Sequence, residues 1–260
     1  MASQNVVLST DQVAEVLGLL RGADSVELKA SVPDSGRRSV VAAFEMDPLD
    51  AQIRQVAFFD TPDLALNGHG LVVRVRRVQG KPGDAVVKLR PVEPDQLQSS
   101  VRAMKGFGVE VDAMPGGFVC SASLKATVDA DAAKDALAGR TPLPDVLSRQ
   151  QRDFYAEYAP SGVDLSGLVM LGPIMVFKLK FRPPDFDRRM VAELWLYPDG
   201  SRILELSTKG KPAEAFDLAA AARTMLAAKG VDLSAAQQTK TKTALEFFAR
   251  ELTEAGEPGR

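Results

Sequence analysis

The chain has 260 residues, of which 45% are apolar and 25% are charged, and this composition excludes a disordered or collagen-like protein. Its 32 basic and 34 acidic residues give a net charge of −2, so any binding to a polyanion must come from a local cluster of basic residues. A single cysteine, Cys120, excludes an intrachain disulfide and favours a reducing, cytoplasmic setting. A single histidine, His69, excludes a zinc site built on several histidines.

The sequence contains no segment typical of membrane targeting or membrane insertion. Residues 1–7 lack a basic stretch followed by an apolar run. The longest apolar stretch, residues 167–177, is shorter than the ~20 residues that a membrane-spanning helix needs. We therefore expect a soluble protein with no membrane partner.

The first half of the chain is predicted to consist mostly of strands, preceded by one helix. Residues 10–21 carry apolar residues on one helical stripe, and Gly22 ends the pattern. Alternating or β-branched and aromatic segments then predict strands over residues 25–32, 40–44, 54–59, 71–78 and 85–91. The sequence Gly-Lys-Pro-Gly-Asp at 80–84 is typical of a hairpin loop between the last two strands.

The second half mixes helices and strands. Helical patterns cover residues 94–104, 129–138, 145–158, 212–228 and 234–252. Strand patterns cover residues 116–128, 174–182, 190–197 and 202–208. Residues 253–260 are expected to be a disordered tail. No linker rich in glycine or serine divides the chain, so the sequence favours one domain with helices attached.

Basic residues gather on one face of the predicted strands, because residues i and i+2 of a strand share a face. These residues are Lys29, Arg74, Arg76, Lys88, Arg90, Lys125, Lys178, Lys180, Arg182 and Lys209. The acidic residues on the same faces are Glu27, Glu193 and Glu205, and the opposite faces are apolar. Since a solvated sheet face usually mixes charges of both signs, the excess of cations favours a concave anion site over the alternative of a solvated sheet.

This pattern of charges favours metal-dependent chemistry on a polyphosphate. Converging lysines and arginines repel one another unless an anion of several charges neutralises them, and both residue types bind phosphate oxygens well. Carboxylates in such a field are suited to hold a hard divalent cation, which bridges carboxylate and phosphate. The cation can then polarise a phosphoryl oxygen or position a water molecule.

Short segments with charges at alternate positions occur in a fixed order between residues 25 and 209. They are Ser25-Val-Glu-Leu-Lys29, Phe58-Phe-Asp-Thr-Pro-Asp-Leu64, Gly70-Leu-Val-Val-Arg-Val-Arg-Arg77, Val86-Val-Lys-Leu-Arg90, Phe177-Lys-Leu-Lys-Phe-Arg182, Glu193 and Ile203-Leu-Glu-Leu-Ser207. In this order they resemble the strand motifs of the CYTH, or triphosphate tunnel metalloenzyme, family, whose first motif is Glu-x-Glu-x-Lys.

The resemblance implies an α+β fold, an eight-stranded antiparallel β-barrel that forms a charged tunnel with helices packed on its outside. Residues 1–211 would form the barrel with its helical insertions. Residues 212–252 would form C-terminal helices that cover the barrel or contact a second copy in a homodimer.

The family's chemistry implies a hydrolase that cleaves inorganic triphosphate or an organic triphosphate with Mg²⁺ or Mn²⁺. Glu27 and Lys29 would be catalytic, and Glu27, Glu193 and Glu205 would hold the metal. The ten basic residues named above would bind the substrate. A water molecule would attack the terminal phosphorus while the basic rows stabilise the charge on the phosphate oxygens.

The chain departs from the family pattern at acidic positions. Ser25 stands in place of the first motif glutamate, and Ser207 in place of a second closing acid. The middle acidic strand of the family corresponds to Ser121-Ala-Ser-Leu-Lys125, which has no acid. The remaining two or three carboxylates can still hold Mg²⁺ together with waters and substrate oxygens.

Two other functions stay open. An adenylyl cyclase of the same family would use the ribose 3′-hydroxyl of ATP in place of water, although no adenine-binding motif is visible. A polyphosphate-binding module without activity is suggested by Ser25 and Ser207. Nucleic acid is disfavoured as a partner because the basic residues alternate on one face and are not interleaved with aromatic residues.

Overall fold

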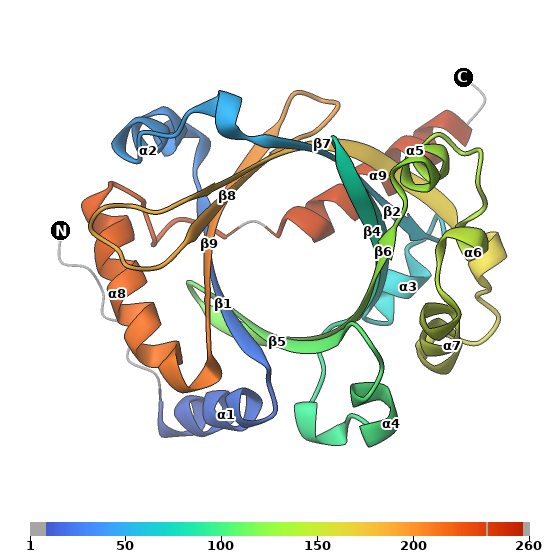
Figure 1. Cartoon of the computed structure of the whole chain (residues 1–260), viewed down its shortest axis with the longest axis horizontal. Helices are drawn as coiled ribbons and strands as arrows, with labels where there is room; N and C mark the ends of the chain where they lie inside the picture. Colours follow the sequence, from blue (N-terminus) through green and yellow to red (C-terminus); the bar gives the residue numbers. More distant parts are fainter. Residues whose placement is uncertain (1–8, 238, 257–260) are drawn as a thin grey trace.

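The computed structural model describes residues 9–237 and 239–256, and its centre is a closed β-barrel (Figure 1). Its strands follow one another in the order β1-β5-β6-β4-β3-β2-β7-β8-β9, and β9 pairs with β1 to close the ring. The strands are β1 Ser25–Val32, β2 Gln52–Asp60, β3 Leu71–Val78, β4 Lys81–Leu89, β5 Phe107–Met114, β6 Gly117–Val128, β7 Val169–Phe181, β8 Met190–Leu196 and β9 Arg202–Gly210.

The prediction of an eight-stranded antiparallel barrel was wrong in the number of strands and in the direction of one strand pair. The described residues form nine strands, and β1 runs parallel to β5 while the other neighbours are antiparallel. The additional strand is β5, which lies between the predicted helix 94–104 and the predicted strand 116–128. Its alternation of Val109, Val111 and Ala113 with polar residues is typical of a strand, but Gly106 and Gly108 weaken the pattern at its start.

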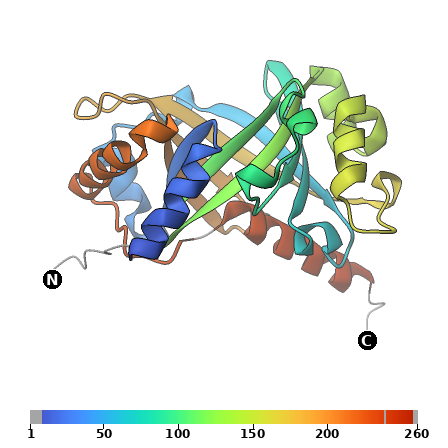
Figure 2. The same cartoon turned by 90° about the horizontal axis from the view of Figure 1, so that it is seen from below.

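Helices surround the barrel on its outside, except for the last one, which lies across one end (Figures 1 and 2). They are α1 Thr10–Arg21, α2 Arg37–Ala43, α3 Ala65–Gly68, α4 Ser99–Arg102, α5 Ala130–Leu137, α6 Leu143–Val146, α7 Arg149–Tyr158, α8 Ala215–Ala228 and α9 Lys240–Gly256. Buried apolar residues of α1, α2 and α8 pack on the outer faces of β1, β5, β8 and β9. Those of α5 and α7 pack on the outer faces of β3 and β4.

Helix α2 replaces the strand that the sequence predicted over residues 40–44, so that prediction was wrong. Val40 is completely buried, and Phe44 packs in the same apolar cluster. A spacing of four residues brings both side chains to one face of a helix, whereas the branched valines alone resemble a strand. Helix α9 continues to Gly256, and residues 257–260 of the predicted tail lie outside the described residues, as does the segment 1–7.

Alternation along each strand separates an apolar outside from a charged inside. In β3, Val73 and Val75 are buried against the outer helices, and Arg74 and Arg76 point to the other face, where they pair with Asp84. The same period of two operates in β4, where Ala85 and Val87 face outward. The burial of the outer faces therefore fixes the register that sends the charges inward.

Helix α9 lies across one end of the barrel (Figures 1 and 2). Its Ala244 and Leu245 pack into a third apolar cluster with inward-facing residues of the barrel. This cluster includes Val56, Phe58, Leu171, Ile174, Val176, Trp195 and Ile203. Trp195 stacks on Phe58 with ring centroids 6.3 Å apart, so it is a packed aromatic residue at the closed end. Among the described residues, no helix combines the length and apolar character needed to cross a bilayer.

Candidate functional site

Charged side chains from every strand of the barrel, and one from α9, meet in its interior. The cations of this set are Lys29, Arg54, Arg74, Arg76, Lys88, Arg90, Lys125, Lys178, Lys209 and Lys240. The acids are Glu27, Asp84, Glu110, Asp112, Glu193 and Glu205. Ten cations and six acids leave an excess of four positive charges in the set. Two cavities, of about 520 and 290 Å³, lie outside the barrel.

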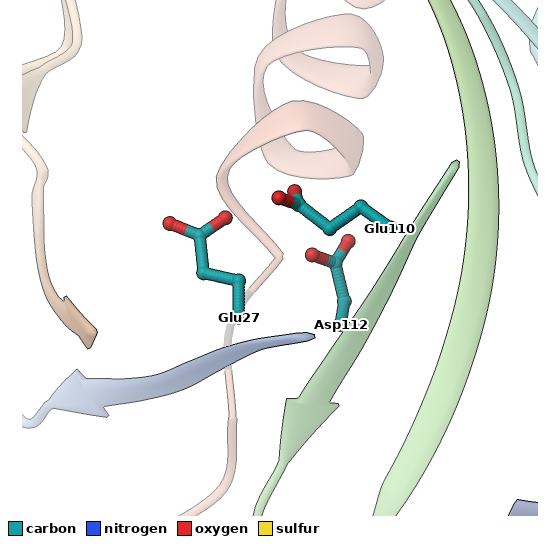
Figure 3. Close-up of side chains that lie close together, drawn as sticks. All are labelled: Glu27, Glu110 and Asp112. Atoms are coloured by element: carbon teal, nitrogen blue, oxygen red, sulfur yellow. The ribbon is translucent and has the colours of Figure 1, made fainter. Parts of the chain in front are cut away.

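Three of the acids form one cluster, which we call the acidic triad: Glu27, Glu110 and Asp112 (Figure 3). One carboxylate oxygen of each lies within 4.8 Å of the others. The parallel pairing of β1 with β5 produces this arrangement, because Glu27 is the register partner of Asp112, and Glu110 is two residues earlier on the same face of β5. The strand missed from sequence therefore supplies two of the three carboxylates.

Lysines and arginines contact the acidic triad closely. Lys29 Nζ lies 2.7 Å from Asp112 Oδ1 and 3.2 Å from Glu27 Oε2. Arg90 Nη1 lies 2.9 Å from Asp112 Oδ2. Lys209 pairs with Glu110, which also accepts a 3.2 Å hydrogen bond from the Ser25 hydroxyl. These cations balance the three acids, which would otherwise repel one another.

The acids of the triad differ in their ionisation. Burial raises the pKa of Asp112, but the charges of Lys29 and Lys88 outweigh burial and hold this pKa below its usual value. The same competition between burial and the neighbouring charges of Lys29 and Lys209 lowers the pKa of Glu27. Burial and the charge of Glu27 raise the pKa of Glu110 instead. The triad therefore contains two carboxyl groups with a lowered pKa, Asp112 and Glu27, and one with a raised pKa, Glu110.

A second group of charges surrounds Asp84 of β4. Arg76 Nε donates to Asp84 Oδ2 at 2.9 Å, while Arg74 Nη2 lies 3.6 Å from Asp84 Oδ1 and Lys125 Nζ lies 3.9 Å from Asp84 Oδ2. Arg74 Nε and Asp84 Oδ1 are buried without a hydrogen bond. Burial, with the charge of Arg76 added, lowers the pKa of Arg74 to about 10. Three cations on one acid leave unused capacity to bind an anion here.

A third group contains Glu193 and Glu205, which are register partners on β8 and β9. Lys178 Nζ lies 2.8 Å from Glu193 Oε1, and Lys240 Nζ lies 2.8 Å from Glu205 Oε1 and also pairs with Glu193. Burial raises the pKa of Glu193, but the charges of Lys240 and Lys178 hold it well below its usual value.

The structure brings most of the residues predicted from sequence into this interior. Lys180 shares the face of Lys178 but is exposed, and Arg182 follows the end of β7, where its Nη1 donates to the Asp187 carbonyl at 3.4 Å. Sequence reasoning missed the interior residues Arg54, Asp84, Glu110, Asp112 and Lys240. Glu110 and Asp112 could have been found from their i, i+2 spacing between outward-facing valines.

The acidic triad fits a small divalent cation. It offers three carboxylates, which are the hard oxygen ligands that Mg²⁺ and Mn²⁺ bind. Asp112 Oδ2 accepts no hydrogen bond but lies 2.9 Å from Arg90 Nη1, so a metal ion at this oxygen would compete with the guanidinium group. Lys29 lies between Glu27 and Asp112, and a divalent cation would compete with its ammonium group for these carboxylates.

Solved structures with the same fold place this barrel among known proteins. A proposed adenylate cyclase from Bacillus halodurans matches with a TM-score of 0.60 and 14% identity, covering 85% of this chain and 97% of that one. A proposed adenylyl cyclase from Hippeastrum, described as having a dominant triphosphatase activity, matches with a TM-score of 0.61 and 17% identity, covering 86% and 96%. The chain shares the barrel fold of these two proteins. No protein-family profile and no curated protein sequence matches it.

Proposed function

We propose that the chain is a metal-dependent hydrolase that cleaves a phosphoric anhydride bond of inorganic triphosphate or of an organic triphosphate. The observation that carries this proposal is the acidic triad, three carboxylates within 4.8 Å of one another, set among Lys29, Lys88 and Arg90 in a barrel interior. Carboxylates that hold Mg²⁺ or Mn²⁺ beside cations that hold phosphate are the parts that phosphoryl transfer needs.

The charge balance supports a substrate with several negative charges. The interior set has four more cations than acids, and a linear triphosphate has about four negative charges at neutral pH. Because the interior cations are paired with acids, a bound triphosphate would replace part of these ion pairs with contacts to its own oxygens. A divalent cation at the triad would release Lys29 from Glu27 and Asp112, so metal and phosphate binding should assist one another.

The chain's own residues would have distinct roles in hydrolysis. Arg74, Arg76 and Lys125 lie around one acid and would hold phosphoryl oxygens, because their charge exceeds that of Asp84. A bound metal ion would supply Lewis-acid polarisation of a phosphoryl oxygen. A triad carboxylate would accept a proton from the attacking water as the new P–O bond forms and the bridging P–O bond breaks. Lys29 and Lys209 would stabilise the charge that develops on the leaving phosphate.

A hydrolysis assay tests the proposal directly. Purified protein is incubated with inorganic triphosphate or with ATP, with and without Mn²⁺, and phosphate, pyrophosphate and cyclic AMP are measured. We expect metal-dependent phosphate release from triphosphate, and a loss of about 100-fold or more in Glu27→Gln, which keeps the shape of the side chain but removes its charge. The matched control is Glu246→Gln, since this glutamate lies on the exposed side of α9 and pairs with Lys242.

The same assay separates the two alternatives. Cyclic AMP as the main product from ATP would indicate a cyclase, a reading supported by the fold that the chain shares with proposed adenylyl cyclases. Tight triphosphate binding without turnover, with or without Mn²⁺, would indicate a binding module. The dense pairing of the triad with lysines and arginines is the observation that keeps this last alternative open.

A further inference from the structure

Lys240, the first residue of α9, inserts a cation between two carboxylates of the barrel. Its Nζ lies 2.8 Å from Glu205 Oε1 and also pairs with Glu193. The two glutamates face each other across neighbouring strands β8 and β9. The side chains of Glu193, Glu205 and Lys240 are 12%, 7% and 19% exposed, so this ion pair is shielded from water.

The charged groups around Lys240 have partners of opposite charge. Lys178 takes the other oxygen of Glu193 at 2.8 Å, and the Lys240 ammonium lies 5.4 Å from the centre of the Trp195 ring. The buried side-chain atoms without a hydrogen bond, among the residues described, are Arg74 Nε, Asp84 Oδ1 and Asp112 Oδ2. None belongs to this group, whereas Asp112 belongs to the acidic triad.

Two buried glutamates at directly paired positions of neighbouring strands need a cation between them, because their negative charges would otherwise repel each other. A divalent metal ion would meet that need, and so does an ammonium group. Lys240 reaches this position on a helix that Ala244 and Leu245 anchor in the apolar end of the barrel. The cation is therefore part of the packed structure and does not have to be recruited from solution.

We propose that Lys240 is a built-in substitute for a second divalent cation, so that the chain binds one metal ion at the acidic triad and none at Glu193 and Glu205. The occupancy of the triad rests on the proposed function, but the exclusion of metal from Glu193 and Glu205 does not. Glu193 and Glu205, which the sequence predicts as metal ligands, would then bind a metal ion only when the Lys240 ammonium group is removed.

Manganese binding to the full-length protein tests the inference without an activity readout. Free Mn²⁺ is followed by its electron paramagnetic resonance signal as the ion is titrated into wild-type protein, Lys240→Met and Lys242→Met. We expect about one bound ion per chain for the wild type and about two for Lys240→Met. Lys242→Met, whose side chain is 66% exposed two residues further along α9, is the matched control and should bind about one. Adding Glu205→Gln to Lys240→Met should return the count to about one.

The outcomes distinguish the role of Lys240 from the metal site of the proposed function. Two ions bound to the wild type, or an unchanged count in Lys240→Met, would overturn the role of Lys240 and leave the triad untouched. No ion in the wild type but one in Lys240→Met would support Lys240 and remove the metal site of the proposed function. If Lys240→Met does not fold, the variants Glu27→Gln and Glu205→Gln decide. We expect Glu27→Gln to lose the single bound ion. If Glu27→Gln still binds the ion and Glu205→Gln does not, the inference is overturned.

Discussion

Asp112 is completely buried and yet carries a charge, because three cations surround it. Lys29, Lys88 and Arg90 lie between 2.7 and 3.7 Å from its two oxygens. Removing one partner of a buried ion pair leaves the other charge without compensation in a medium that solvates it poorly. The residue therefore has a structural role in addition to its proposed role as a metal ligand.

We expect Asp112→Asn to lower the free energy of unfolding by about 3–5 kcal/mol, since it leaves the surrounding cations without their shared counter-charge. Urea unfolding without metal measures the change. Asp135→Asn is the control: Asp135 pairs with Arg140 on the surface, where the side chains are 42% and 57% exposed, and the loss should be about 0–1 kcal/mol. Equal losses in the two variants would contradict the view that the triad is a coupled buried network.

Glu193 should make stability depend on pH in the acid range. Its pKa is well below 4.5 in the folded protein and close to 4.5 in the unfolded chain, so the unfolded state binds the proton more tightly. The stability that its charge contributes is present above about pH 4.5 and is lost as the pH falls toward the folded pKa. We expect the difference in unfolding free energy between wild type and Glu193→Gln to shrink below pH 4.5.

Urea unfolding between pH 3 and pH 7 measures this dependence. Glu251→Gln is a suitable control because Glu251 is exposed on α9, and its difference from the wild type should stay constant over the same range. A Glu193→Gln difference that is also constant would mean that Lys240 and Lys178 do not stabilise the ionised carboxylate.

At the scale of single elements, the hairpin of β5 and β6 depends on a close backbone approach at Gly106. This residue has a φ of +87°, and a Cβ atom there would lie 2.2 Å from the carbonyl oxygen of Lys125. The Lys125 amide donates to the Gly106 carbonyl at 3.0 Å, so the approach is part of the pairing at the start of β5. Only glycine fits this position without moving backbone.

Gly106→Ala should therefore destabilise the protein more than Gly116→Ala, by about 1–3 kcal/mol in unfolding free energy. Gly116 is the matched control. An alanine there would also have to adopt a positive φ, near +98°, but nothing lies within 4 Å of its Cβ position. Thermal and urea unfolding of the two variants give the comparison. If both substitutions cost the same, the contact with Lys125 does not determine the position of β5.

The limits of prediction from sequence are also clearest at this scale. Alternation identified the inward faces of β3, β4 and β9, because period two depends only on local sequence. It did not reveal that β5 pairs in parallel with β1, since pairing between distant segments is set by how the outer apolar faces pack. Asp84 was assigned to a hairpin loop, but β4 begins at Lys81 and carries it inward. Lys240 arrives on a helix, to which the strand rule does not apply.

At the scale of the whole molecule, the barrel concentrates charge that the net charge of −2 conceals. The interior set has four more cations than acids, so the remainder of the chain is correspondingly acidic. A field of this kind acts on an anion through many weak contacts and is reduced by salt. The affinity for an anionic ligand should therefore depend on all the interior charges together. The salt dependence of this affinity should distinguish binding in the interior from binding to a few surface residues.

Inorganic triphosphate with Mn²⁺ should stabilise the protein, by about 2.7 kcal/mol when the ligand is present at 100 times its Kd, because it binds the folded barrel and not the unfolded chain. Orthophosphate at the same concentration should stabilise much less, since it neutralises fewer of the cations. Thermal unfolding at increasing NaCl concentrations measures the effect, which should fall as salt rises.

A pair of lysine variants locates that stabilisation. Lys125→Ala removes a half-exposed cation inside the barrel, 3.9 Å from Asp84, whereas Lys134→Ala removes an exposed lysine of α5 on the outside. We expect the first variant to lose part of the triphosphate-induced rise in Tm and to have a weaker salt dependence, and the second to match the wild type. Triphosphate that raises the Tm of both variants equally would bind elsewhere, because an anion held in the interior must contact the field to which Lys125 contributes.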